Sequence, residues 1–118
     1  MRAEVRSLTT VDFGDLEKYD PEVFDNFCVA IRVMVGPYGA PGEESFDAFV
    51  CTTKWLEQEL QAAEILLARH YLIVRTFNYE VLRKFIEQYV RRCEGDSWEE
   101  VARKVGYLGR WEFENYQA

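Results

Sequence analysis

Few side chains in this 118-residue sequence are able to do chemistry, and their spacing matches no familiar catalytic or metal-binding set. His70 is the only histidine, and Cys28, Cys51 and Cys93 form neither a CxxC pair nor a zinc-ligand spacing with it. We therefore expect no metal site and three reduced thiols. His70 precedes an apolar run, which predicts a hydrogen-bonding residue at a strand edge. The competing interpretation is a small hydrolase that uses His70 with a nearby carboxylate.

Carboxylates occur in adjacent pairs, Glu43/Glu44 and Glu99/Glu100, but neighbouring residues diverge on a helix or strand and seldom share a substrate. The chain has no GxSxG, P-loop, HExxH or dinucleotide motif, and its acids lack the spacing of a calcium loop. Gly36, Gly39 and Gly42 are interrupted by prolines and open no helix, so they predict no phosphate cradle. The sequence thus predicts no enzyme and no cofactor.

The negative charge lies entirely in the first half of the chain. Residues 1–59 hold 12 acids and 5 bases, whereas residues 60–118 hold 9 of each, which together give the net charge of −7. One stretch, opposed only by Lys18, holds six of these acids: Asp12, Asp15, Glu17, Asp20, Glu22 and Asp25. Such a field repels nucleic acid and anionic membranes and speeds encounter with a positively charged partner. The plain alternative is a solvated loop that serves solubility.

Basic side chains on the residue 78–93 segment raise the opposite possibility of nucleic-acid contact. They alternate with acids along the segment: Arg83, Lys84, Arg91 and Arg92 with Glu80, Glu87 and Glu94. A self-neutralised helix face is the better interpretation, so we expect no nucleic-acid partner.

Length and composition predict one globular domain over residues 1–118. Residues 1–6 carry charge where a signal peptide needs an apolar run, and no window reaches the ~18 apolar residues of a membrane span. We therefore expect a cytoplasmic protein.

Alternating and β-branched runs predict strands over residues 2–8, 27–35, 45–52 and 69–76. The run at 27–35 is apolar on both faces, which is typical of a central strand, and 69–76 is expected to be central too. If the second and third runs pair with residue numbers that sum to 79, Cys28 faces Cys51 and Arg32 faces Asp47. A facing thiol pair could oxidise.

Three helices are expected, with N-caps at Thr52 or Thr53, Asn78 and Ser97. Apolar residues at helical spacing predict the faces that pack on the core: Leu56, Leu60, Ala63 and Leu67; Leu82, Phe85, Ile86, Tyr89 and Cys93; Trp98, Val101, Ala102 and Val105. Gly95 and Gly106 are predicted to end the second and third helices.

Residues 111–116 are either an edge strand or an extended tail. The expected fold is α+β, a mostly antiparallel four- to five-stranded sheet with two to three helices on one face.

Four aromatic or aliphatic residues, Phe13, Leu16, Tyr19 and Phe24, are expected to pin the acidic loop to the domain. Trp55 and Trp98 are expected in the core. Trp111 fits either the core or a binding surface.

Seven segments occur in a distinctive order: Met1–Leu8, Gly36-Pro37, Gly42–Asp47, Cys51–Leu56, Arg69–Val74, Cys93–Glu100 and Gly109–Tyr116. Together they resemble the immunity protein 8 family, small cytosolic partners of bacterial polymorphic and contact-dependent toxins. The resemblance implies a protein that binds a toxin domain, blocks its active site and catalyses nothing. The alternative function is an acidic adaptor module that binds several basic partners.

Many toxins of such systems attack nucleic acid through a positively charged groove, which an acidic protein can fill. The predicted toxin-binding residues are therefore carboxylates: Asp12, Asp15, Glu17, Asp20, Glu22 and Asp25, supported by Glu43, Glu44, Glu112 and Glu114.

Overall fold

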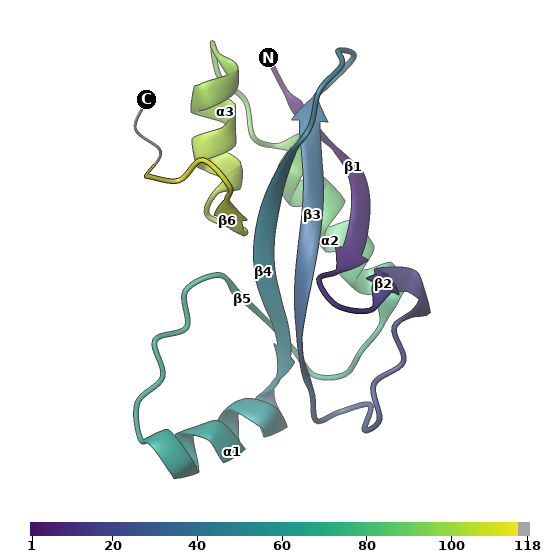
Figure 1. Ribbon diagram of the computed structural model, residues 1–118, viewed down its shortest axis with the longest axis vertical. Helices are drawn as coiled ribbons and strands as arrows, with labels where there is room; N and C mark the ends of the chain where they lie inside the picture. Colours follow the sequence, from purple (N-terminus) through teal and green to yellow (C-terminus); the bar gives the residue numbers. More distant parts are fainter. Residues whose placement is uncertain (116–118) are drawn as a thin grey trace.

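The computed structural model describes residues 1–115. A six-stranded sheet has the order β2-β1-β3-β4-β5, and β6 pairs with β4 beside β5 (Figure 1). The strands are β1 (Ala3–Thr10), β2 (Gly14–Asp15), β3 (Cys28–Pro37), β4 (Glu44–Thr52), β5 (Tyr71–Val74) and β6 (Arg110–Trp111). The helices are η1 (Leu16–Lys18), α1 (Thr53–Ala63), α2 (Tyr79–Arg91) and α3 (Trp98–Val105). The predicted α+β class is confirmed, and no helix within residues 1–115 has the length and apolar character to cross a membrane.

The central hairpin has the register predicted from the sequence. Cys28 lies opposite Cys51 and Arg32 opposite Asp47, and the Arg32 guanidinium makes two hydrogen bonds of 2.9 Å to the Asp47 carboxylate. The two side chains of this ion pair are 44% and 40% exposed, so solvent screens the pair and it adds at most about 1 kcal/mol to stability. Its value here is that it confirms the register.

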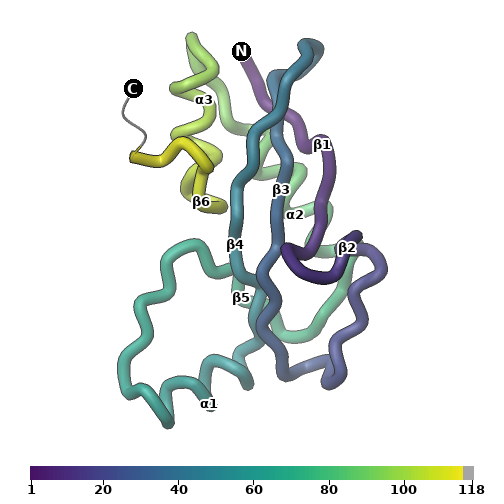
Figure 2. Tube along the Cα trace, viewed as in Figure 1, coloured from purple at the N-terminus to yellow at the C-terminus, as the bar shows by residue number. Residues whose placement is uncertain are grey.

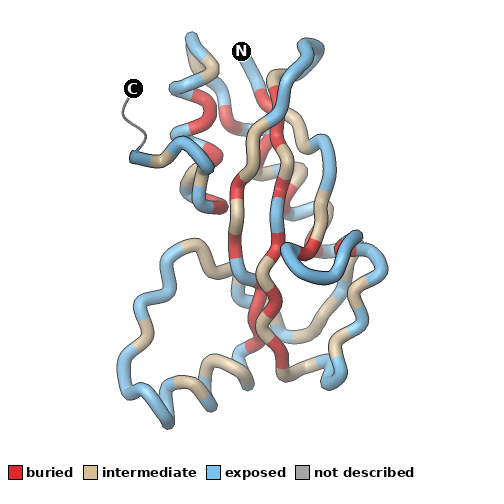
Figure 3. The backbone as a smooth tube through the Cα atoms, viewed as in Figure 1, coloured by how far each residue is buried: buried red, intermediate tan, exposed pale blue. Residues whose placement is uncertain are grey.

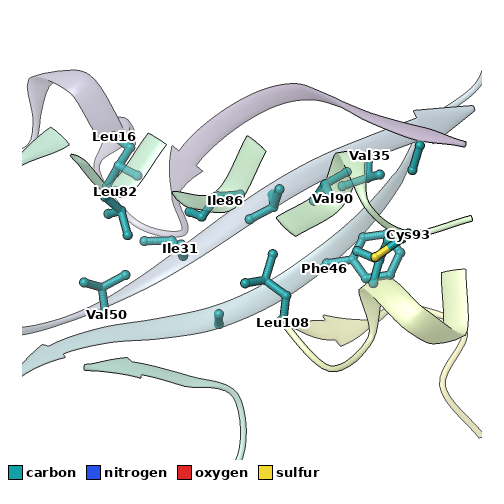
Figure 4. Packing of buried hydrophobic residues seen from close by; sticks show 14 of the residues in the cluster. Leu16, Ile31, Val35, Phe46, Val50, Leu82, Ile86, Val90, Cys93 and Leu108 are labelled. Carbon is teal, nitrogen blue, oxygen red and sulfur yellow. The ribbon is translucent and has the colours of Figure 1, made fainter. Parts of the chain in front are cut away.

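Alternate residues of the two long strands build the core. Ile31, Val33 and Val35 of β3 are fully buried, as are Phe46 and Val50 of β4. They face the apolar side of α2, and Figure 4 shows Leu82, Ile86 and Val90 closing over them. α3 adds Val101, Ala102 and Val105, as its spacing predicts.

The predicted N-caps are confirmed in all three helices. The side chains of Thr52, Asn78 and Ser97 accept hydrogen bonds from the backbone amides of Trp55, Val81 and Glu100. The α3 capping box is incomplete, because the Glu100 carboxylate accepts from the Asp96 amide rather than from Ser97.

The prediction that α1 packs an apolar stripe on the core is wrong. None of its residues is buried, and Figure 3 shows α1 without a buried segment. The helix ends at Ala63 because Glu64 adopts φ 65°, so the stripe stops before Leu67, which is 89% exposed. α1 and the following segment project from the sheet, and the chain then returns to β5 (Figure 2).

Two details of α2 also differ from the prediction. The helix ends at Arg91, not at Gly95, because the segment after it forms a backbone hydrogen bond with the start of the chain, from the Gly95 amide to Met1 O. Gly95 is required for a different reason, since a Cβ there would lie 2.9 Å from the Glu100 side chain. Phe85, expected in the buried face, is 54% exposed.

β5 is shorter than the predicted strand and lies at an edge of the sheet rather than at its centre. It pairs with β4 alone and runs parallel to it. Of the C-terminal edge strand or tail predicted over residues 111–116, Trp111 lies in β6, residues 112–115 form turns rather than an extended segment, and Tyr116 lies outside the described residues.

Cys28 and Cys51 are free thiols that lie opposite each other across the hairpin. The pKa of Cys51 is raised to about 11, mainly by burial and in smaller part by the neighbouring Cys28. Burial also raises the pKa of Cys28.

We expect iodoacetamide to alkylate Cys51 at pH 8 at least about 100-fold more slowly in the folded protein than in urea, because only the thiolate reacts and a raised pKa keeps the thiol protonated. Mass spectrometry of each cysteine peptide measures the rates. Equal rates in the folded and unfolded chain would contradict this environment.

Candidate functional site

The acidic stretch and α1 lie toward the same end of the molecule, in the lower part of Figure 1. Residues 11–25 and 53–64, here called the acidic end, contain nine acids and two bases, a net charge of −7. The remaining 12 acids and 12 bases cancel, so the acidic end accounts for the whole net charge. Sequence reasoning missed the contribution of Glu57, Glu59 and Glu64, because the apolar residues between them suggested a helix packed on the core.

Specific contacts fix the backbone of the acidic loop. Thr10 is buried at the end of β1, and its hydroxyl donates to Gly14 O and accepts from the Phe13 amide, at 3.0 and 2.7 Å. Gly14 has φ 92°, a conformation that disfavours a side chain. Leu16 is fully buried, and Tyr19 packs edge-on against Phe27 and Phe77. The predicted anchoring by Leu16 and Tyr19 is therefore confirmed.

Phe13 and Phe24 do not anchor the loop, contrary to prediction. Their side chains are 75% and 65% exposed, and Val23 is 49% exposed. Further apolar side chains are exposed across the same end, on α1 and the segment after it: Leu60, Ile65 and Leu67. Large apolar residues surrounded by charge are a common composition of protein-binding surfaces.

The carboxylates of the loop are mostly uncompensated. Asp25 pairs with Lys54 of α1, at 2.6 Å, and this contact joins the two parts of the acidic end. Within residues 1–115, no cation lies within 4.0 Å of the other loop carboxylates, those of Asp12, Asp15, Glu17, Asp20 and Glu22. Their field is therefore available to a partner.

The four supporting carboxylates lie apart from the loop. Glu43 lies at the β3–β4 turn, at the opposite end of the molecule (Figure 1). Glu112 accepts from the Ser45 amide at 2.7 Å, and Glu114 forms an ion pair with Arg69. Glu44 accepts from two tryptophans. Glu44 and Glu112 therefore hold α3 and the C-terminal segment against β4, and Glu114 holds the C-terminal segment to the residues before β5.

Glu44 lies in a cleft of about 1150 Å³ between α3, β6 and the segment before β5. We call it the tryptophan cleft, because Trp98 and Trp111 both donate their indole N–H to Glu44 Oε1, at 2.6 and 2.9 Å. Trp98 and Trp55, expected in the core, are only half-buried, and so is Trp111. The sequence gives no signal for this cleft, since Glu44 lies 54 residues from Trp98.

Within residues 1–115, the His70 ring forms its hydrogen bond with the backbone and none with a carboxylate. Its Nε2 lies 2.8 Å from Gly106 O, so the ring donates to a carbonyl, as expected for a residue at a strand edge. No three metal-ligating side chains gather within the described part of the chain. On α2, Arg83 binds both Glu80 and Glu87, three and four residues away, so this part of the basic face is neutralised within the helix.

A protein-family comparison matches residues 3–116 to the model described as immunity protein 8. The chain belongs to the immunity protein 8 family. This membership covers nearly all of the sequence and identifies the chain as an immunity protein whose partner is a cognate toxin. No curated protein and no solved structure shows a significant match to it.

Proposed function

We propose that this immunity protein binds a positively charged, nuclease-type toxin domain through its acidic end and blocks the active site of that domain. The observation that carries the proposal is the concentration of the entire net charge of −7 on residues 11–25 and 53–64, most of it without a cationic partner. A nuclease groove is lined with cations that bind phosphates, and a row of carboxylates presents similar charges to it.

The mixture of charge and apolar surface fits an inhibitor. Carboxylates steer the encounter, and electrostatic steering raises association rates toward about 10⁸–10⁹ M⁻¹s⁻¹ at low salt. Exposed aromatic residues such as Phe13 and Phe24 then supply contact area that excludes water and slows dissociation. The buried Leu16 keeps this surface in place before binding.

Occlusion is tested by competition between the immunity protein and nucleic acid. The cognate toxin domain, sought among the products of neighbouring genes, is purified as a catalytically inactive variant and bound to a fluorescent DNA or RNA duplex. We expect the immunity protein to displace the duplex stoichiometrically. A stable ternary complex would contradict occlusion, and a toxin without affinity for nucleic acid would contradict the nuclease assignment.

Binding selectivity distinguishes an acidic adaptor from a toxin-specific inhibitor. An immunity protein should bind its cognate toxin tightly at 150 mM salt and leave unrelated basic proteins unbound. Lysozyme and cytochrome c serve as matched basic controls in calorimetry. Comparable weak binding to all three proteins, lost as salt rises, would support the adaptor instead.

A further inference from the structure

The tryptophan cleft holds a carboxylate in an unusual setting. Glu44 is the first residue of β4 and is half-buried. Its Oε1 accepts both indole N–H groups, whereas its Oε2 has no hydrogen-bond partner within residues 1–115. The two tryptophans therefore fix the direction in which the second oxygen points.

The negative charge of Glu44 is not balanced inside the cleft. No lysine or arginine of the described chain lies within 4.0 Å of it. The two arginines that line the cleft are already paired, Arg69 with Glu114 and Arg103 with Glu99. The His70 ring is committed to the Gly106 carbonyl. Glu44 is thus the carboxylate of the cleft that lacks a cation.

Aromatic rings surround this carboxylate. Trp98 and Trp111 reach it directly, and Tyr107, which is 83% exposed, also lines the cleft. Faces of tryptophan and tyrosine attract cations, and they attract the planar guanidinium group of arginine most often. A fixed carboxylate among aromatic rings is a favourable environment for an arginine side chain.

We propose that the tryptophan cleft is a second recognition site, which receives one arginine side chain of the toxin against Glu44. The guanidinium group binds Glu44 Oε2 and stacks on an indole. The volume of about 1150 Å³ exceeds that of one side chain, so the arginine arrives on a protruding segment. The identity of this partner rests on the proposed function, but the chemistry of the site can be tested without the toxin.

The direct test uses N-acetyl-arginine amide as a probe and N-acetyl-citrulline amide as its uncharged counterpart. Tryptophan fluorescence reports binding, because two of the three tryptophans line the cleft. We expect a saturable change with the arginine compound, with a dissociation constant on the order of millimolar for a ligand of this size. Glu44→Gln should abolish it, because glutamine retains an acceptor for the indoles but loses the charge. An identical response to both compounds, no response to either, or an unchanged response in Glu44→Gln overturns the proposal.

The second test measures toxin affinity by calorimetry. We expect Glu44→Gln to weaken binding roughly 30-fold or more, the range of an interface hot spot. The control is Glu94→Gln, which removes the same charge from an exposed residue outside the cleft and outside the acidic end, and it should change affinity less than about threefold. Tight binding that is equal in the wild type and Glu44→Gln would overturn the arginine site and leave the proposed function intact. Absence of binding by the wild type would instead refute the proposed function. Unfolding temperatures of both variants show whether the fold is retained.

Discussion

Reversing four charges of the acidic loop should slow association with the toxin by about 10- to 1000-fold at low salt, which is the factor by which electrostatic steering raises association rates. The variant is Asp12→Lys, Asp15→Lys, Glu17→Lys and Asp20→Lys, which changes the net charge from −7 to +1. All four side chains are exposed and have no ion pair in the described chain, so the fold should be unchanged. Stopped-flow association measured from 25 to 300 mM salt should show that the difference shrinks as salt rises.

A control variant tests whether the position of the charges matters. Glu94→Lys and Asp96→Lys change the net charge by +4 on exposed residues outside the acidic end. We expect this control to slow association much less than the quadruple reversal. Equal slowing would mean that net charge controls the rate, and an unchanged rate in the quadruple variant would place the interface elsewhere, most plausibly on a helical face.

Phe46→Ala should cost about 3–5 kcal/mol of unfolding free energy, because it removes a large side chain from a packed core. Phe46 is fully buried in β4 and stacks on Trp111, with ring centroids 6.4 Å apart and planes within 10°. The loss is a large share of the about 5–15 kcal/mol that stabilises a typical domain. Urea titration followed by circular dichroism measures it.

The matched control is Phe46→Leu, which keeps most of the volume and should cost less than about 1.5–2 kcal/mol. Since Trp111 rests on Phe46 and binds Glu44, Phe46→Ala should also shift the tryptophan emission of the folded protein. A loss below about 1 kcal/mol would show that the core does not depend on this contact.

The central hairpin was predictable because two independent signals agree. Alternating apolar residues specify which face is buried, and a slip of one residue would turn the buried face of one strand, with Val33 or Phe46, to solvent. The pairing of Arg32 with Asp47 supports the same register. The helix starts were predictable for a local reason, since a capping side chain and the amide that it accepts from lie within a few residues.

The α1 prediction failed because helical periodicity does not say what the apolar stripe faces. Leu60 is 40% exposed, and Ile65 and Leu67 are more so, although their spacing resembles that of a core helix. A stripe that binds a partner has the same pattern as one that packs on a sheet. For Phe13 and Phe24 too, the sequence alone does not distinguish a core residue from an exposed one.

The charge of the candidate site was visible in the sequence, but its full extent was not. The acidic loop is contiguous in the chain, whereas α1 joins it only through the fold and the Asp25–Lys54 contact. The tryptophan cleft depends on three residues from distant segments, Glu44, Trp98 and Trp111. Convergence of this kind is a property of the tertiary structure, which local patterns do not encode.

The central claim is that the acidic end of this immunity protein neutralises a toxin, and survival of intoxicated cells tests it most directly. The cognate toxin domain is induced in bacteria that produce, at equal soluble levels, the wild-type protein or the quadruple loop variant. We predict that the wild type restores growth and that the variant restores it poorly. Cell death that the soluble wild-type protein fails to prevent would contradict the account.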